Sequence, residues 1–202
     1  MVSRATAGSV FGRFLCMVVL ALVASCGAAP RGAPVSPGNS VAAQASPSTT
    51  YHLGIEWSRV YTSLSSLKKD SDMAVVGSIA ALLARPPATA KAGLPSSVYL
   101  LQISQALYDP HDLAMSSIHL YQNGGTIDGQ LIPADGDPLF QIGDHVILFL
   151  QHDGPGLYIV SGGPTGRFVI DNDGTVRGIY PAGVILPSGT TVSAFSSMVK
   201  NA

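Results

Sequence analysis

The chain has 202 residues and a formal net charge of −1, and only 11% of its residues are charged. This near-neutral balance gives no electrostatic reason to expect a nucleic acid as a partner. The 22 glycines and 14 prolines favour turns and strands over long helices.

The first 25 residues have the organisation of an export signal. Residues 1–13 carry Arg4 and Arg13 and no acidic side chain, and residues 14–23 are apolar without interruption. A charged, then an apolar, then a small-residue region is the order found in secretory signal peptides. Because a membrane-spanning helix needs about 20 apolar residues, the sequence predicts a cleaved signal peptide over residues 1–25 rather than a transmembrane segment.

The apolar stretch ends in Val23, Ala24, Ser25 and Cys26. An aliphatic residue, two small residues and a cysteine resemble the lipobox of bacterial lipoproteins. The resemblance implies that the Cys26 thiol receives a diacylglyceryl group, that cleavage occurs just before it, and that the new amino terminus is often acylated. Since two or more acyl chains anchor a protein stably, we expect a lipoprotein on the extracytoplasmic face of a bacterial membrane, in a cell with one membrane or two. The alternative is an ordinary secretory signal with a chance cysteine.

Residues 26–50 are predicted to be the lipidated amino terminus and a disordered tether. They are rich in Ala, Pro and Ser, with Arg31 as their one charged residue and no aromatic residue. Such a segment cannot bury enough apolar surface to fold, so we expect it to lift a folded domain clear of the lipid headgroups. A strand around residues 41–43 is the alternative. Because Cys16 leaves with the signal and Cys26 carries lipid, no disulfide is expected in the mature chain.

Residues 51–202 are predicted to form one β-rich domain bracketed by two short helices. Near its start, Val60, Tyr61, Leu64 and Leu67 share one helical face, and serines and lysines lie mostly on the other. The same spacing recurs near the C-terminus at Val192, Phe195 and Val199. We therefore expect a second short helix there that packs back on the domain.

Between these helices, short apolar or alternating stretches predict strands. They cover residues 73–83, 98–108, 118–122, 145–151, 157–160, 167–170 and 175–179. Residues 123–125 (Asn-Gly-Gly) are expected to end the third strand, and residues 171–174 (Asp-Asn-Asp-Gly) to form a hairpin turn between the last two. Short strands separated by turn signals favour a small antiparallel barrel or sandwich.

Three stretches follow one another in the chain: residues 74–79 (Ala-Val-Val-Gly-Ser-Ile), 99–103 and 143–150. Their order is similar to the strand succession of netrin-like and metalloproteinase-inhibitor modules, which are OB-type barrels. The likeness covers roughly residues 73–180. It implies a mainly β fold, a small antiparallel OB-like β-barrel or sandwich with a short N-terminal and a short C-terminal helix. Those modules use cysteines for bridges, and the inhibitors present an amino-terminal cysteine to the zinc of the protease. This domain has no cysteine, so that inhibitory mechanism is not expected.

No metal site and no cofactor are expected. The five histidines, at positions 52, 111, 119, 145 and 152, show no H-x-x-x-H spacing, and no cysteine can join them in the mature domain. Residues 171–174 begin like a calcium-binding loop, but the residues that follow do not continue its ligand pattern. We therefore favour a simple hairpin turn at this position.

Residues 162–167 (Gly-Gly-Pro-Thr-Gly-Arg) look superficially like an anion-binding loop. They lack the spacing, the lysine and the following helix of a phosphate-binding P-loop, so we expect a glycine-rich connection between strands. Arg167 is the first candidate for ligand binding because it is one of few cations in the barrel and lies beside backbone amides that glycine leaves accessible. Asp171 and Asp173 are the other candidate ligand-binding residues.

The sequence predicts a membrane-anchored binding or interaction module rather than an enzyme, with an envelope protein or a glycan as partner and no nucleic acid. The alternative is an envelope hydrolase, or a hydrolase accessory, with its site in the Asp-rich loops. An enzyme predicts a concave pocket in which at least two of Asp135, Asp137, Asp171, Asp173 and His145 converge. A binding module predicts an exposed apolar or aromatic patch.

Overall fold

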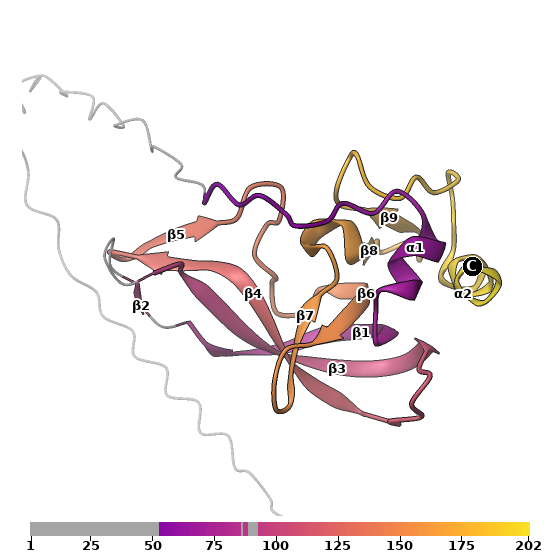
Figure 1. The fold of residues 1–202 in the computed structure, drawn as a ribbon, viewed down its shortest axis with the longest axis horizontal. Helices are drawn as coiled ribbons and strands as arrows, with labels where there is room; N and C mark the ends of the chain where they lie inside the picture. The colour runs from indigo at the N-terminus through magenta and orange to yellow at the C-terminus, as the bar shows by residue number, and fades with distance from the viewer. Residues whose placement is uncertain (1–52, 86, 89–92) are drawn as a thin grey trace, which may run out of the picture. The chain divides into compact units, whose positions relative to one another are not determined.

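The computed structural model describes residues 53–85, 87–88 and 93–202 (Figure 1). The predicted signal peptide, the lipobox with Cys26 and the predicted tether lie outside these residues, as does His52. All of the described residues belong to one compact unit of the chain. Within them, no helix has the length and apolar character that crossing a bilayer requires.

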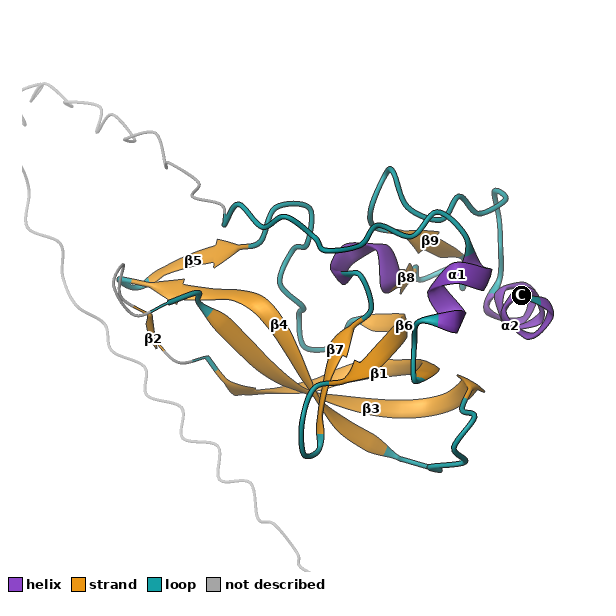
Figure 2. Cartoon of the chain, in the orientation of Figure 1, coloured by secondary structure: helices purple, strands orange, loops and turns teal. Residues whose placement is uncertain are grey.

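The described unit is mainly β with two short helices, which confirms the predicted fold class (Figure 2). The strands are β1 (Met73–Ala84), β2 (Pro87–Ala88), β3 (Ser96–Tyr108), β4 (Ser117–Ile127), β5 (Gln130–Pro133), β6 (His145–His152), β7 (Leu157–Val160), β8 (Arg167–Ile170) and β9 (Val176–Gly178). The helices are α1 (Leu64–Lys69), α2 (Val192–Asn201) and the single 3-10 turn η1 (Gly163–Gly166).

Five of the strands form a ring in the order β1, β3, β4, β7 and β6, and β6 pairs with β1 to bring the sheet back on itself. Four of the ring's pairings are antiparallel, and the pairing between β4 and β7 is parallel. A closed ring with an odd number of strands cannot alternate in direction all the way round, so one parallel pair is required. The ring is therefore a small five-stranded barrel, and β8 and β9 extend its sheet from β6.

The first half of β1 and most of β6 are buried on both faces. Val75 and Leu148 belong to a cluster inside the barrel, whereas their neighbours Val76 and Phe149 belong to a second cluster outside it. Successive side chains of a strand point to opposite faces, so these two strands separate two apolar cores. This burial accounts for the nearly continuous apolar sequence that predicted β1 and β6.

Both predicted helices are present, and they cover the outer core. The first is shorter than its predicted face, because α1 begins at Leu64, and Val60 and Tyr61 precede it, with Val60 exposed. Ser63 caps α1 by accepting a hydrogen bond from the backbone N–H of Ser66, and the fully buried Phe195 of α2 packs on Phe168 with ring centroids 4.8 Å apart. Lys68 Nζ donates to the carbonyl oxygens of Val199 and Ala202, 2.9 and 3.1 Å away. A cation at these last carbonyls complements the negative end of the helix dipole, so Lys68 joins α1 to α2.

The expectation that residues 123–125 end a strand is wrong, because β4 continues through them to Ile127. A Cβ at Gly125 would lie 2.7 Å from the carbonyl oxygen of Ser96 in β3, so glycine here permits a close approach between two backbones. The chain reverses at Asp128 and Gly129, which both have positive φ, and returns as β5. This strand was not predicted, although Asp-Gly is a common pair in tight hairpin turns.

Candidate functional site

Three neighbouring strands of the barrel place one row of side chains on its outer face. Tyr121 of β4 is in register with Ile159 of β7, and Ile159 is in register with Gln151 of β6. Leu120 and Tyr158, one position earlier on their strands, belong to the core inside the barrel. Because alternate residues face opposite sides, Tyr121, Ile159 and Gln151 together form an outward-facing floor.

Residues 53–61, here called the strap, run past this floor toward α1 (Figure 1). At one end, Leu53 exchanges backbone hydrogen bonds of 2.9 Å with the β5 carbonyl of Pro133 and the N–H of Asp135. Further along, Trp57 Nε1 donates to the carbonyl of Asp135 at 3.4 Å, and the N–H of Tyr61 contacts Thr165 Oγ1 at 3.5 Å. The strap is thus attached to the barrel along its length.

The glycine-rich connection between β7 and β8 receives the aromatic rings of the strap. A Cβ at Gly163 would lie 2.2 Å from two ring carbons of Trp57, and a Cβ at Gly162 would lie 2.6 Å from the ring of Tyr61. Both glycines have positive φ, of 56° and 63°, which favours glycine at these positions. The predicted connection between strands is confirmed, and its glycines make room for two aromatic side chains of the same chain.

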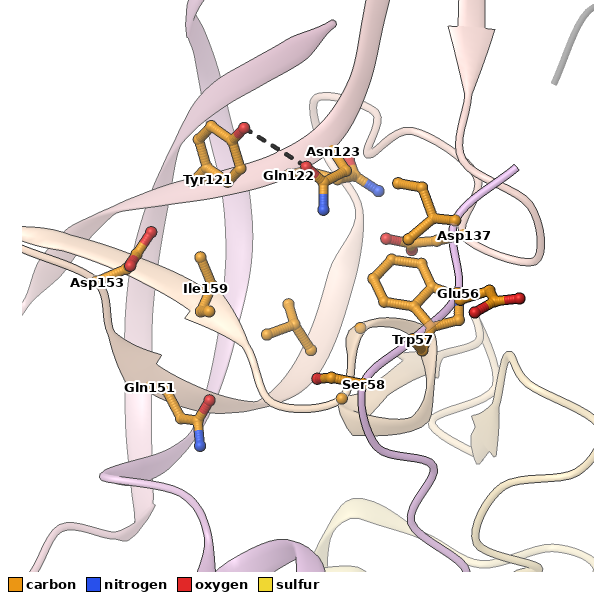
Figure 3. A pocket seen from close by; sticks show the side chains of 14 residues that line it. Glu56, Trp57, Ser58, Tyr121, Gln122, Asn123, Asp137, Gln151, Asp153 and Ile159 are labelled. Carbon is orange, nitrogen blue, oxygen red and sulfur yellow. Dashed lines mark hydrogen bonds between the residues drawn. The ribbon is translucent and has the colours of Figure 1, made fainter. Parts of the chain in front are cut away.

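Between the strap and the barrel floor lies a pocket of about 340 Å³, here called the strap pocket (Figure 3). Figure 3 shows Trp57 on one side of it and Tyr121, Ile159 and Asp153 on the other. The Tyr121 hydroxyl donates to Asn123 Oδ1 at 3.5 Å, and Gln151 Nε2 donates to the backbone carbonyl of Asp70. Among the described residues, nothing else hydrogen-bonds the side chains of Asn123 and Gln151, so Asn123 Nδ2 and Gln151 Oε1 remain available to a ligand.

Behind the pocket, Arg167 and Asp137 form a buried ion pair with 3.1 Å between Nη1 and Oδ1. The two side chains are 4% and 6% exposed, and the Arg167 guanidinium also lies 3.7 Å from the centroid of the Phe140 ring and 3.5 Å from Asp144 Oδ2. Burial raises the pKa of the Asp137 carboxyl, against the opposing effect of Arg167, and burial also lowers the pKa of the Arg167 guanidinium.

This ion pair fixes the loop that connects β5 to β6. Arg167 also donates to the carbonyl of Pro138, and the side-chain amide of Gln122 donates to the same carbonyl at 3.0 Å while accepting from the N–H of Phe140 at 3.1 Å. Phe140 is buried in the inner core against Tyr99, with ring centroids 5.5 Å apart. The predicted ligand residue Arg167 thus lies inside the wall of the strap pocket, where it holds Asp137 and the loop in place.

The other two candidate ligand residues lie in the predicted hairpin turn between β8 and β9. Asp171 pairs with Arg177 at 3.0 Å, and Asp173 Oδ1 accepts hydrogen bonds from the N–H and Oγ1 of Thr175 at 2.9 and 2.6 Å. Arg167 begins the four-residue strand β8 and Asp171 directly follows its last residue, roughly 13 Å away at the rise of an extended strand. The structure therefore does not bring Asp171 and Asp173 together with Arg167.

The acidic and histidine side chains that a hydrolase would bring together do not converge in the strap pocket. Of the five residues named for it, Asp137 lines the strap pocket, and Asp171 lines a second, more open pocket beside β9. In the part of the chain that the structure describes, no three His, Cys, Asp or Glu side chains are placed to hold a metal ion. A scan against known protein families finds no family that matches this chain, and a search of curated proteins finds no matching relative.

Sequence reasoning did not single out Trp57, Tyr121, Asn123 or Gln151. A signal was present for two of them. In the predicted strand 118–122, alternation with the apolar Ile118 and Leu120 places Tyr121 on the opposite face, and Trp57 is the one tryptophan of the chain. The sequence could not supply the register that aligns β4 with β7, because these two strands are far apart in the chain.

Proposed function

We propose that this protein is a lipoprotein, anchored through Cys26 to the extracytoplasmic face of a bacterial membrane, whose β-barrel is a binding module with the strap pocket as its ligand site. The observation that carries the binding role is the strap pocket itself. It is concave, it combines the Trp57 and Tyr121 rings with amide side chains, and its size of about 340 Å³ falls in the range of small-molecule sites, roughly 300–1,000 Å³.

The anchoring role is supported by the residues that precede the barrel. The apolar run, the small residues and Cys26 have the lipobox order, and the Ala, Pro and Ser-rich residues 26–50 separate the cysteine from the strap. The strap is the first described segment after that tether and forms one side of the pocket. In this proposal, the chain that ties the barrel to the membrane also completes its binding site.

The anchor is tested by the Cys26→Ser variant. We expect the wild type in the membrane fraction, with a mature amino-terminal peptide that begins at Cys26 and carries the mass of a diacylglyceryl group. Cys26→Ser should lack this mass, remain unprocessed and leave the membrane fraction, because serine has no thiol to accept the lipid. Fractionation and mass spectrometry of the amino-terminal peptide provide the measurement.

Cys16→Ser is the matched control, since it changes the other cysteine within the signal and leaves the lipobox intact. We expect it to mature like the wild type. If Cys26→Ser fractionates and migrates as the wild type does, the lipoprotein proposal is wrong.

A further inference from the structure

We propose that the strap pocket binds a neutral saccharide, one or two sugar rings of an extracytoplasmic glycan, with the Trp57 ring as its apolar wall. This inference rests on the proposed binding function and names its ligand class. It is argued from three properties of the pocket: the aromatic and aliphatic surface, the polar atoms that remain available, and the charge of the lining.

The apolar part of the pocket lies on two opposing sides. The six-membered part of the Trp57 ring rests against Gly163, which fixes it beside the pocket. Ile159 of β7 provides aliphatic surface across from it (Figure 3). A pyranose ring has C–H faces that pack on aromatic and aliphatic surface, and an aromatic side chain supplies a large rigid area for this contact.

The polar part of the pocket presents both hydrogen-bond donors and acceptors. Asn123 Nδ2 is an available donor, and Gln151 Oε1 is an available acceptor. The Tyr121 hydroxyl, which donates to Asn123, can still accept, and the Ser58 hydroxyl can act as either. Sugar hydroxyls also donate and accept at once. A mixed set of this kind matches a polyhydroxylated ligand better than a purely apolar one, because each buried hydroxyl needs a partner.

The charge of the lining disfavours anions. Among the residues that the structure describes, Glu56, Asp137 and Asp153 are the charged ones that line the pocket, and no lysine or arginine lines it. Asp137 is neutralised by Arg167 behind it, and Figure 3 shows the Glu56 carboxylate pointing away from Ile159. With no described cation in the lining, nothing there attracts phosphates, sulfated sugars or nucleic acids. The exposed carboxylate of Asp153 gives little attraction for a cation in water, which favours a neutral ligand over a basic peptide.

Because Trp57 is the one tryptophan of the chain, its fluorescence reports directly on this pocket. Full-length protein in detergent is titrated with three neutral disaccharides, N,N′-diacetylchitobiose, cellobiose and maltose. We expect a saturable change in Trp57 emission with at least one of them, confirmed by calorimetry and unchanged by added salt. Tyr121→Ala and Gln151→Ala should each weaken this binding about tenfold, the effect of losing one buried contact or hydrogen bond.

His119→Ala is the matched control, because His119 lies two residues from Tyr121 on the same exposed face of β4 but does not line the pocket. It should bind as the wild type does. A trilysine peptide is titrated in parallel. If trilysine binds through Tyr121 and Gln151 and no disaccharide does, the saccharide proposal is overturned while the binding function stands. If neither kind of probe changes the Trp57 emission, both the saccharide proposal and the assignment of the strap pocket as the ligand site are wrong. The membrane anchor is tested separately, by Cys26→Ser.

Discussion

At the scale of single residues, the contact between Gly163 and Trp57 determines whether the strap pocket has its aromatic wall. The φ of Gly163 is +56°, and a Cβ there would lie 2.2 Å from the Trp57 ring. Gly163→Ala should therefore lower the free energy of unfolding and shift Trp57 emission toward that of exposed indole. Urea unfolding and the emission spectrum measure both effects.

Gly156→Ala measures the free-energy cost of a left-handed backbone without a steric clash of the new Cβ. Gly156 has a similar φ of +72°, but a Cβ at this position would have no atom within 4 Å. Its variant should therefore lose only about 1–2 kcal/mol, the cost of a left-handed alanine. Gly163→Ala should lose more than that. Equal losses in the two variants, with Trp57 emission unchanged, would show that the ring does not rest on Gly163.

Arg167 is the second residue whose contacts lead to a stability prediction. Because Asp137 is buried beside it, Arg167→Met leaves an unpaired carboxylate in the protein and should cost about 3–5 kcal/mol of stability. The exposed pair of Arg177 with Asp171 provides the comparison, and Arg177→Met should cost less than about 1 kcal/mol. Urea unfolding of both variants is the measurement.

The double variant Asp137→Asn/Arg167→Met should recover part of the loss, since it removes the uncompensated charge. If Arg167→Met costs no more than Arg177→Met, the buried ion pair does not hold the loop between β5 and β6.

At the scale of elements, strands whose sequence is apolar throughout could be predicted, and strands set by tertiary contacts could not. β6 was predicted because both of its faces are buried. β4 was expected to stop at Asn-Gly-Gly, but Gly125 is required there by the close approach of Ser96 in β3, a contact that no local pattern contains. β5 was not predicted because it contains a proline, which argues against a strand in a sequence pattern.

The hairpin between β8 and β9 gives a prediction about pH. Hydrogen bonds from the side chain and the backbone of Thr175 lower the pKa of Asp173 below its ordinary value of 3.8. The folded state therefore releases the proton more readily than the unfolded state, and this contribution to stability is present above the unfolded pKa and is lost as the pH falls through the folded one. Asp173→Asn should be less stable than the wild type near pH 7, and the difference should disappear in strong acid.

Urea unfolding of the wild type and Asp173→Asn across this pH range measures the effect. NMR titration of the Asp173 carboxyl in Thr175→Val provides a second readout, since removing one donor should raise its pKa. A stability difference that stays constant from neutral pH to strong acid would contradict the charge-dependent role.

At the scale of the whole molecule, ring closure and site formation are linked. Five strands in a ring require one parallel pair, and that pair, β4 with β7, is the one that aligns Tyr121 with Ile159 on the pocket floor. The sequence predicted the β fold and its two helices, but the pocket depends on this alignment and on the strap, which comes from elsewhere in the chain. The residues proposed for ligand binding from sequence, Arg167, Asp171 and Asp173, make contacts with their own chain, and their ligand role stays a prediction.

The central claim is that the anchored barrel binds its partner in the cell envelope through the strap pocket. In-cell photo-crosslinking with a benzophenone amino acid at position 121 tests it most directly, with position 119 on the same face of β4 as the control. We predict adducts from position 121 that are absent from position 119 and are lost when Cys26 is replaced by serine. The same adducts from both positions, or none from position 121 in the anchored protein, would contradict the claim.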